Sequence, residues 1–84
     1  MPKIVITASV RDFASWYQSD AKNLKERKAE VYQKHDHPND IVIIANVPSF
    51  ESAVAELYSD AVKTRMAEHG FDFNSMKILA VTEL

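Results

Sequence analysis

The chain has no cysteine, so its three histidines are the side chains best suited to acid–base or metal chemistry. His35 and His37 are two residues apart, so in an extended backbone they share one face and would hold a metal ion between them. Asp36 and Asp40 lie next to them, whereas His69 is far along the chain. A solvated turn explains this cluster more simply, because Asp side chains stabilise turns. We therefore expect no bound metal.

A second group of side chains is suited to lining a pocket for an organic ligand. Asn46 is an amide in the most apolar segment of the chain, where it needs hydrogen-bond partners if it is buried. It would either orient a substrate carbonyl or mark the open end of its strand. Trp16 follows a helical apolar stripe and is expected in the core or at the mouth of a cavity. The candidate ligand-pocket residues are Trp16, Tyr32, Asn46, Tyr58 and His69.

His69 has a simpler interpretation beside the functional one, and two tyrosines complete the set of pocket candidates. His69 lies where a helix is expected to end, so it either interacts with the negative end of the helix dipole or acts in catalysis. Tyr32 and Tyr58 would each offer a phenolic hydroxyl inside a pocket. No catalytic residue is identifiable from spacing alone.

The first half of the chain predicts a strand, a helix and a hairpin to position these residues. Residues 4–10 alternate around β-branched side chains, which is typical of a strand. Asp12 is a good helix N-cap, and apolar residues recur after it at helical spacing, so residues 12–26 are expected to form a helix. Residues 29–35 and 41–47 are expected to be two strands joined by a proline-containing turn.

The second half predicts a helix with a break in it and a final strand. Ser49 is a second N-cap, and apolar residues continue at helical spacing as far as Gly70. Ser59 is a further capping residue in the middle, which indicates two segments that meet at a kink. Gly70 is placed to end the helix in the left-handed conformation. Residues 71–75 are expected to be a connection, and residues 76–81 the last strand.

The order of these elements, β-α-β-β-α-β, defines the expected fold class. Two crossovers around a central hairpin give a four-stranded antiparallel sheet with both helices on one face. The class is therefore α+β and ferredoxin-like, with a single domain over residues 1–84. An 84-residue chain gains little stability from its own core, and self-association is one way to increase it.

The strand expected over residues 41–47 is apolar on both of its faces. Ile41 and Ile43 lie on one face, and Val42 and Ile44 lie on the other. Two helices cover only one face of a sheet, and an antiparallel sheet with its other face in water alternates apolar with polar residues. We therefore expect a second copy of the chain to cover the open face as a homodimer. The hairpin register, which decides which face is open, is left undetermined.

Composition restricts the partners of the chain. It has 10 basic and 12 acidic residues and a formal net charge of −2, which provides no field for attracting nucleic acid. The longest apolar run, residues 41–45, is far shorter than the roughly 20 residues of a membrane span. No signal peptide fits the N-terminus and the lack of cysteine suits a reducing compartment, so we expect a cytoplasmic protein. The expected partners are a second copy and a small-molecule ligand, with no nucleic acid, no membrane and no cofactor.

Nearly the whole chain resembles the dimeric α/β-barrel superfamily, and in particular its antibiotic biosynthesis monooxygenase-like members. The resemblance is carried by the helix start at residues 10–16, the hairpin at residues 37–43 and the stretch over residues 58–70. It implies two sheets packed face to face across a dimer axis. It also implies a ligand cavity between the helices and the sheet, with aromatic side chains at its mouth.

Two hypotheses from different functional classes follow. The one we favour is a homodimer that binds a small hydrophobic organic ligand in the helix–sheet cleft. The first strand contains no Asn, a residue that the best-known enzymes of the resembling superfamily have there, and this difference favours binding over catalysis. The alternative is a cofactor-free enzyme with a monooxygenase-like or isomerase-like reaction on a small organic substrate.

Overall fold

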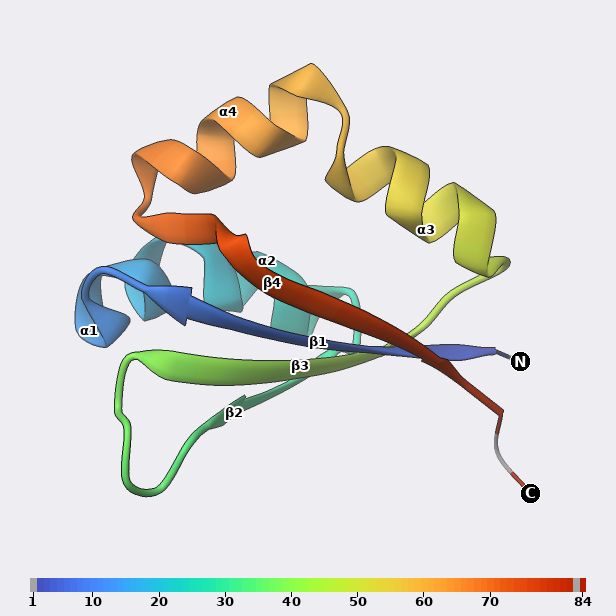
Figure 1. Cartoon of the computed structure of the whole chain (residues 1–84), viewed down its shortest axis with the longest axis horizontal. Coiled ribbons are helices and arrows are strands. Elements are labelled where there is room, and N and C mark those ends of the chain that lie inside the picture. Colours follow the sequence, from blue (N-terminus) through green and yellow to red (C-terminus); the bar gives the residue numbers. More distant parts are fainter. Residues whose placement is uncertain (1, 83) are drawn as a thin grey trace.

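The computed structural model describes residues 2–82 and 84, and its framework is an antiparallel sheet (Figure 1). The strands are β1 (Lys3–Val10), β2 (Glu30–Gln33), β3 (Asp40–Asn46) and β4 (Phe71–Val81). They lie in the order β2-β3-β1-β4, and every neighbouring pair is antiparallel. The structure therefore confirms the α+β, ferredoxin-like fold class.

The first helical layer is formed by three consecutive segments that follow β1. They are α1 (Phe13–Trp16), a π-helical turn η1 (Tyr17–Ala21) and α2 (Lys22–Glu26). The carboxylate of Asp12 accepts a hydrogen bond from the backbone N–H of Ser15 at 3.1 Å, so this N-cap is confirmed. The helix was predicted over the correct residues, but the π-helical turn within it was not.

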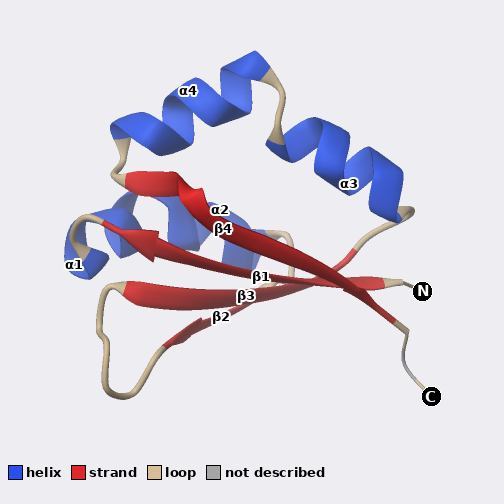
Figure 2. Cartoon of the chain, in the orientation of Figure 1, coloured by secondary structure: helices blue, strands red, loops and turns tan. Residues whose placement is uncertain are grey.

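The second helical layer contains the predicted break. Helix α3 (Phe50–Leu57) and helix α4 (Asp60–Glu68) are separate in Figure 2, with an angle between their axes. The hydroxyl of Ser59 donates to the carbonyl of Glu56 at 2.8 Å and makes no capping bond to α4. Gly70 follows α4 with a φ of +89°, the left-handed conformation that was expected.

Two strand boundaries differ from the predicted ones. The strand expected over residues 29–35 is shorter, because pairing with β3 stops at Gln33 and the chain then leaves the sheet as a loop. The segment expected to be a connection over residues 71–75 belongs to β4, because Phe71 pairs with Val10 and is buried. An irregularity in the pairing of β1 with β4 falls between Thr7 and Ser9.

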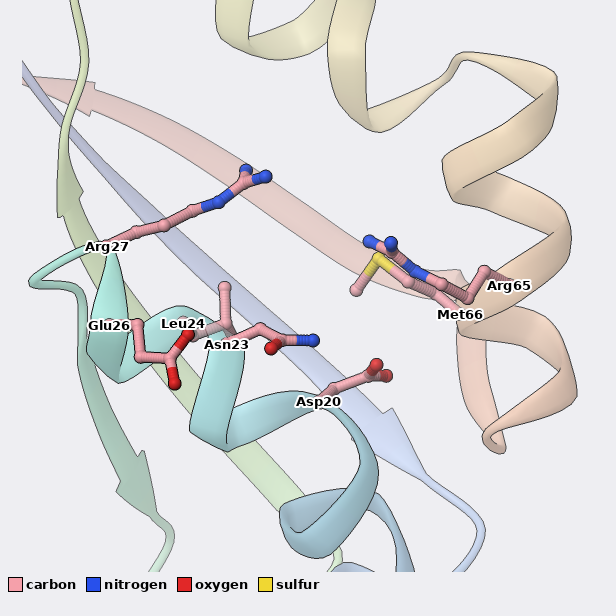
Figure 3. A pocket seen from close by; sticks show the side chains of 7 residues that line it. All are labelled: Asp20, Asn23, Leu24, Glu26, Arg27, Arg65 and Met66. Carbon is pink, nitrogen blue, oxygen red and sulfur yellow. The ribbon is translucent and has the colours of Figure 1, made fainter.

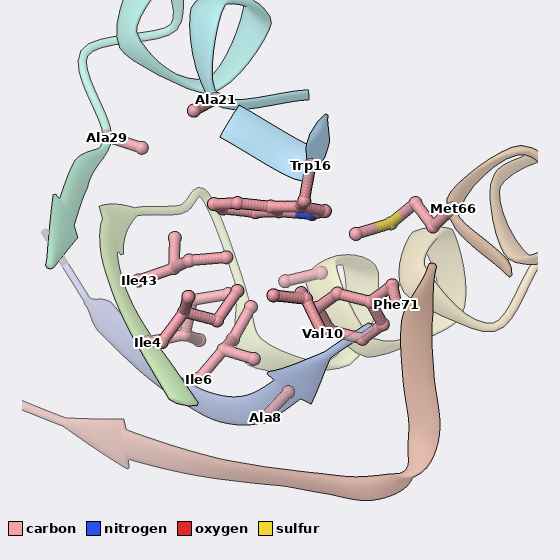
Figure 4. Packing of buried hydrophobic residues seen from close by; sticks show 12 residues of the cluster. Ile4, Ile6, Ala8, Val10, Trp16, Ala21, Ala29, Ile43, Met66 and Phe71 are labelled. Carbon is pink, nitrogen blue, oxygen red and sulfur yellow. The ribbon is translucent and has the colours of Figure 1, made fainter. Parts of the chain in front are cut away.

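The core lies between the sheet and the helices. Residues of β1 alternate between buried and half-buried, which places Ile4, Ile6, Ala8 and Val10 on the face under the helices. The indole of Trp16 is fully buried and lies over the isoleucines of the sheet, beside the side chain of Met66 (Figure 4). Both helical layers therefore pack on the same face of the sheet.

Candidate functional site: a cleft between the helices and the sheet

A cavity of about 250 Å³ lies between the sheet and the helices, and we call it the cleft. Its walls are contributed by β1, β3, β4 and three of the helices. Most of the side chains that line it are apolar, and they include Ile4, Ile6, Ile43, Ala53, Leu57 and Phe71. Ligand sites have this general character, an apolar interior with a small number of polar groups.

A second hollow of about 280 Å³ adjoins the cleft, and we call it the mouth. Four residues line both spaces: Leu24, Arg27, Arg65 and Met66. Asp20, Asn23 and Glu26 line the mouth only. Figure 3 shows that the mouth lies between the first helical layer and α4, with side chains reaching into it from both sides. An apolar interior therefore opens into a polar, charged entrance.

The end of α2 shapes one wall of the cleft. The backbone N–H of Ala29 donates to the carbonyl of Leu24, and that of Lys28 donates to the carbonyl of Lys25, both at 2.9 Å. This pair of bonds is a Schellman motif, and it requires a left-handed residue, here Lys28 with φ 63°. The motif holds Leu24 against Ala29, and both side chains line the cleft.

The most unusual polar group in the structure is the carboxylate of Asp20 in the π-helical turn. Its side chain is only 7% exposed, and its Oδ1 accepts a hydrogen bond of 2.8 Å from Nδ1 of His69. Its Oδ2 is buried and has no hydrogen-bond partner among the described residues. A buried polar atom without a partner costs about 1–3 kcal/mol. Such a cost, in a π-helical turn, is characteristic of functional sites.

The pair formed by Asp20 and His69 determines the tautomer of the histidine. A carboxylate oxygen accepts hydrogen bonds, so Nδ1 of His69 is the donor and carries a hydrogen. In the neutral ring, Nε2 is then left with a lone pair, as in Asp–His pairs that act as a base. The pair also joins the first helical layer to the end of α4.

Two arginines from different elements border both the cleft and the mouth. Arg27 pairs with Glu56 at 3.3 Å, and both side chains are largely exposed. Arg65 on α4 makes no side-chain hydrogen bond or ion pair within residues 2–82 and 84. Arg65 is therefore the guanidinium that is available to an incoming anion.

Of the five predicted pocket residues, the structure places Asn46 in the wall of the cleft, at the end of β3. Trp16 is buried in the core beside Met66, a residue of both the cleft and the mouth. Its Nε1 is buried and has no partner among the described residues. His69 is partly exposed and contacts Asp20 at the mouth.

Neither of the two candidate tyrosines is among the residues that line the cleft. Tyr32 pairs with Val42 across the β2–β3 hairpin and therefore lies on the sheet face opposite the helices. Its hydroxyl donates to the carboxylate of Glu30 at 2.8 Å. Tyr58 lies in the break between α3 and α4, where it is 49% exposed and packs against Phe73. The hairpin register in one case and the helix break in the other direct these rings away from the cleft.

Sequence reasoning missed Asp20 and Arg65. A signal for Asp20 was present, because it lies four residues after Trp16 and four before Leu24, inside the apolar stripe of its helix. A carboxylate at such a position is either exposed by a local distortion or buried with a partner. Arg65 gave no comparable signal, since a charged residue on an exposed helix surface is ordinary.

The described residues contain no group of three or more His, Cys, Asp or Glu side chains placed to hold a metal ion. His35 and His37 are exposed in the loop between β2 and β3. In the same part of the chain, no helix has the length and apolar character needed to cross a membrane.

The sheet order and the position of the cleft place the structure in the ferredoxin-like class, with a cavity between helices and sheet. Neither a family model nor a curated protein sequence matches the chain. Solved structures do match it over nearly its whole length, and three of them are assigned as antibiotic biosynthesis monooxygenases. The resemblance expected from the sequence is therefore confirmed at the level of the fold.

The three structures have low sequence identity to the chain. One is 8% identical with a TM-score of 0.67, and the match covers 100% of this chain and 99% of that protein. The protein from Deinococcus radiodurans is 15% identical with a TM-score of 0.67, over 99% of this chain and 92% of its own. The protein from Nitrosomonas europaea is 14% identical with a TM-score of 0.70, over 99% and 89%.

Proposed function

We propose that the chain binds a small, largely apolar organic molecule in the cleft and works as a homodimer. The observation that carries the first part is the cavity of about 250 Å³ with its apolar walls. An apolar cavity of about 150 Å³ stays dry and accepts a benzene ring. The cleft is large enough for an aromatic ring with a short substituent.

A titration with ethylbenzene tests the binding site. In two-dimensional amide NMR spectra we expect shift changes concentrated on residues that line the cleft. Ala53→Phe places a ring in the cleft from α3 and should abolish these changes. Ala55→Phe on the same helix is the matched control, because Ala55 is exposed and lines neither the cleft nor the mouth. Shift changes scattered over the surface, or unaffected by Ala53→Phe, would contradict the proposal.

The second part of the proposal rests on the open face of the sheet. The strand registers place Val5, Ile44 and Leu79 in one row across β3, β1 and β4. These side chains point away from the helices, and Leu79 is 61% exposed. Val42 and Tyr32 follow in the adjacent row. This apolar set is larger than the isolated exposed side chains that are normal on a monomer.

A second copy of the chain is the occupant that we propose for this face. An isologous contact brings the same apolar rows together from both copies, so each row finds apolar surface without a further partner. The row of Val5 begins with Glu30 at one edge of the sheet, and the adjacent row ends with Lys77 at the other. If the two-fold axis of the dimer runs parallel to the strands, the β2 edge of one copy lies over the β4 edge of the other. Glu30 of each copy then lies close to Lys77 of its partner.

A monooxygenase-like reaction on a small organic substrate is the second candidate function. It is favoured by the three structural neighbours, which are assigned as antibiotic biosynthesis monooxygenases. An oxygen electrode and ¹⁸O₂ labelling with molecules that bind in the cleft provide the test. Product that contains ¹⁸O with the unmodified chain, and none with Ala53→Phe, would establish catalysis. Binding without turnover would leave the chain a binding protein.

A further inference from the structure

We propose that the ligand carries a carboxylate and, on the neighbouring carbon, a hydrogen-bond donor, as an apolar α-amino acid or α-hydroxy acid does. In this arrangement Arg65 binds the carboxylate, Asp20 accepts from the donor and the cleft holds the apolar side chain. The inference rests on the proposed function, because it assigns the polar head of the molecule whose apolar body occupies the cleft. It is supported by unsatisfied groups at the mouth.

The acceptor for the donor group is Oδ2 of Asp20. The side chain is more than nine-tenths buried, Oδ1 is bonded to His69, and Oδ2 has no partner among the described residues. Figure 3 shows the carboxylate directed from the first helical layer toward α4, across the mouth. A hydroxyl or ammonium group placed there would satisfy Oδ2 with a charge-assisted hydrogen bond.

The site for the carboxylate is Arg65, on the opposite side of the mouth. Its guanidinium has no partner within the described part of the chain, while Arg27 is already paired with Glu56. A guanidinium presents a planar set of donors that matches a carboxylate in a bidentate geometry. The residues that line the mouth include two carboxylates and two guanidiniums, so its charges balance. A head group with both signs suits such a site better than a simple anion.

One molecule can reach both groups and the cleft together. Asp20 and Arg65 both line the mouth, and no ion pair between them is formed. Met66 lies next to Arg65 and lines both the mouth and the cleft. Its unbranched side chain adjusts easily to a new neighbour, so a ligand can extend past it from the mouth into the cleft. The apolar side chain of the ligand then extends into the cleft.

A series of five related compounds tests each contact by NMR titration of the unmodified chain. Phenylalanine and phenyllactate carry both polar groups, phenylpropanoate lacks the donor, phenylethylamine lacks the carboxylate, and ethylbenzene lacks both. We expect phenylalanine or phenyllactate to bind at least about tenfold more tightly than the two compounds with one group, which corresponds to about 1.4 kcal/mol. The tighter of the two identifies the donor as an amine or a hydroxyl.

Two variants assign the contacts to residues. Arg65→Gln should weaken phenylalanine, phenyllactate and phenylpropanoate by about tenfold or more, a loss of about 1.4 kcal/mol, and leave phenylethylamine unchanged. Lys63→Gln is its control, because Lys63 is an exposed cation on the same helix and lines neither space. Asp20→Asn should remove the advantage of phenylalanine over phenylpropanoate. If Asp20→Asn does not fold, the compound series and Arg65→Gln decide the matter.

The outcomes separate this inference from the proposed function. If all five compounds bind in the cleft with similar affinity, the proposed contacts of Arg65 and Asp20 with the ligand are refuted. Binding of an apolar molecule in the cleft is still supported. If no compound binds, ethylbenzene included, both proposals are overturned.

Discussion

Two side chains in the described part of the chain have buried polar atoms without hydrogen-bond partners, which is unusual in a well-packed domain. Trp16 and Asp20 lie four residues apart, and each has a buried polar atom without a partner in the described residues. Leaving both unsatisfied is costly in a chain of 84 residues. Asp20 lines the mouth, and Trp16 lies in the core beside Met66, which lines the mouth as well. The unsatisfied atoms are therefore the residue-scale reason to place ligand recognition at this end of the cleft.

The hydrogen bond between Tyr32 and Glu30 makes the titration of the tyrosine depend on one neighbouring carboxylate. The bond and the negative charge of Glu30 raise the pKa of Tyr32 above its ordinary value of 10.0. Because the folded chain holds this proton more tightly, the associated stabilisation is present below that ordinary value. It is lost as the pH rises through the raised pKa.

We expect Glu30→Gln to lower the pKa of Tyr32 toward its ordinary value, because the charge is removed. NMR titration of ¹³C-labelled tyrosine rings resolves this residue from the other two tyrosines. Glu26→Gln is the control, since that exposed carboxylate lines the mouth among the helices, whereas Tyr32 lies on the opposite face of the sheet. An unchanged Tyr32 titration in Glu30→Gln would show that the bond does not form in solution.

At the scale of elements, the helix ends and the π-helical turn build the site. Helix α2 ends in a Schellman motif around Lys28, and α4 ends at Glu68, with His69 as its C-cap before Gly70. The first ending sets the cleft wall at Leu24 and Ala29. The second brings His69 to Asp20, which η1 presents from the other layer. Both endings use a left-handed residue, but only one of them is glycine.

Substitutions at the two left-handed positions should change stability in opposite directions. Gly70→Ala forces an L side chain into φ +89° and places a Cβ 3.1 Å from Cβ of Arg11, so we expect a loss of about 1–2 kcal/mol. Lys28→Gly relieves a left-handed non-glycine residue, and after the entropy cost of glycine we expect a gain of about 0.5–1 kcal/mol. Urea unfolding at one fixed protein concentration measures both. Equal signs would contradict this account of the helix ends.

At the scale of the whole molecule, the two faces of the sheet have different neighbours. One face is covered by both helical layers and contains the core, as Figure 4 shows. The other face exposes the row of Val5, Ile44 and Leu79. Burying large aliphatic side chains contributes roughly 1.5–3 kcal/mol each, which is considerable against a total stability of about 5–15 kcal/mol. A homodimer gains this contribution, and a monomer forgoes it.

Leu79→Lys tests the homodimer. Leu79 is 61% exposed in the single chain, so lysine there leaves the fold of the chain intact and places an unpaired charge in the proposed interface. We expect sedimentation or light scattering to find a dimer for the unmodified chain at micromolar concentration and a folded monomer for the variant. Ala61→Lys on the exposed surface of α4 should remain a dimer. A stable 9.5 kDa monomer of the unmodified chain would rule out the homodimer.

The amino-acid sequence by itself determined the order of elements, the fold class, the helix break near Ser59 and the left-handed Gly70. These features depend on local periodicity, capping and backbone sterics, which act between near neighbours in the chain. It also indicated that both faces of the third strand are apolar. It could not determine which of them is open, because register is set by pairing between distant segments.

Tertiary structure alone decided the composition of the candidate site. The pairing of Asp20 with His69 joins residues 49 positions apart, and the mouth joins the first helical layer to α4. Tyr32 was directed to the open face by the hairpin register, and residues 71–75 became strand because Phe71 pairs with Val10. Contacts of this kind depend on how whole elements pack, and propensities of single residues do not encode them.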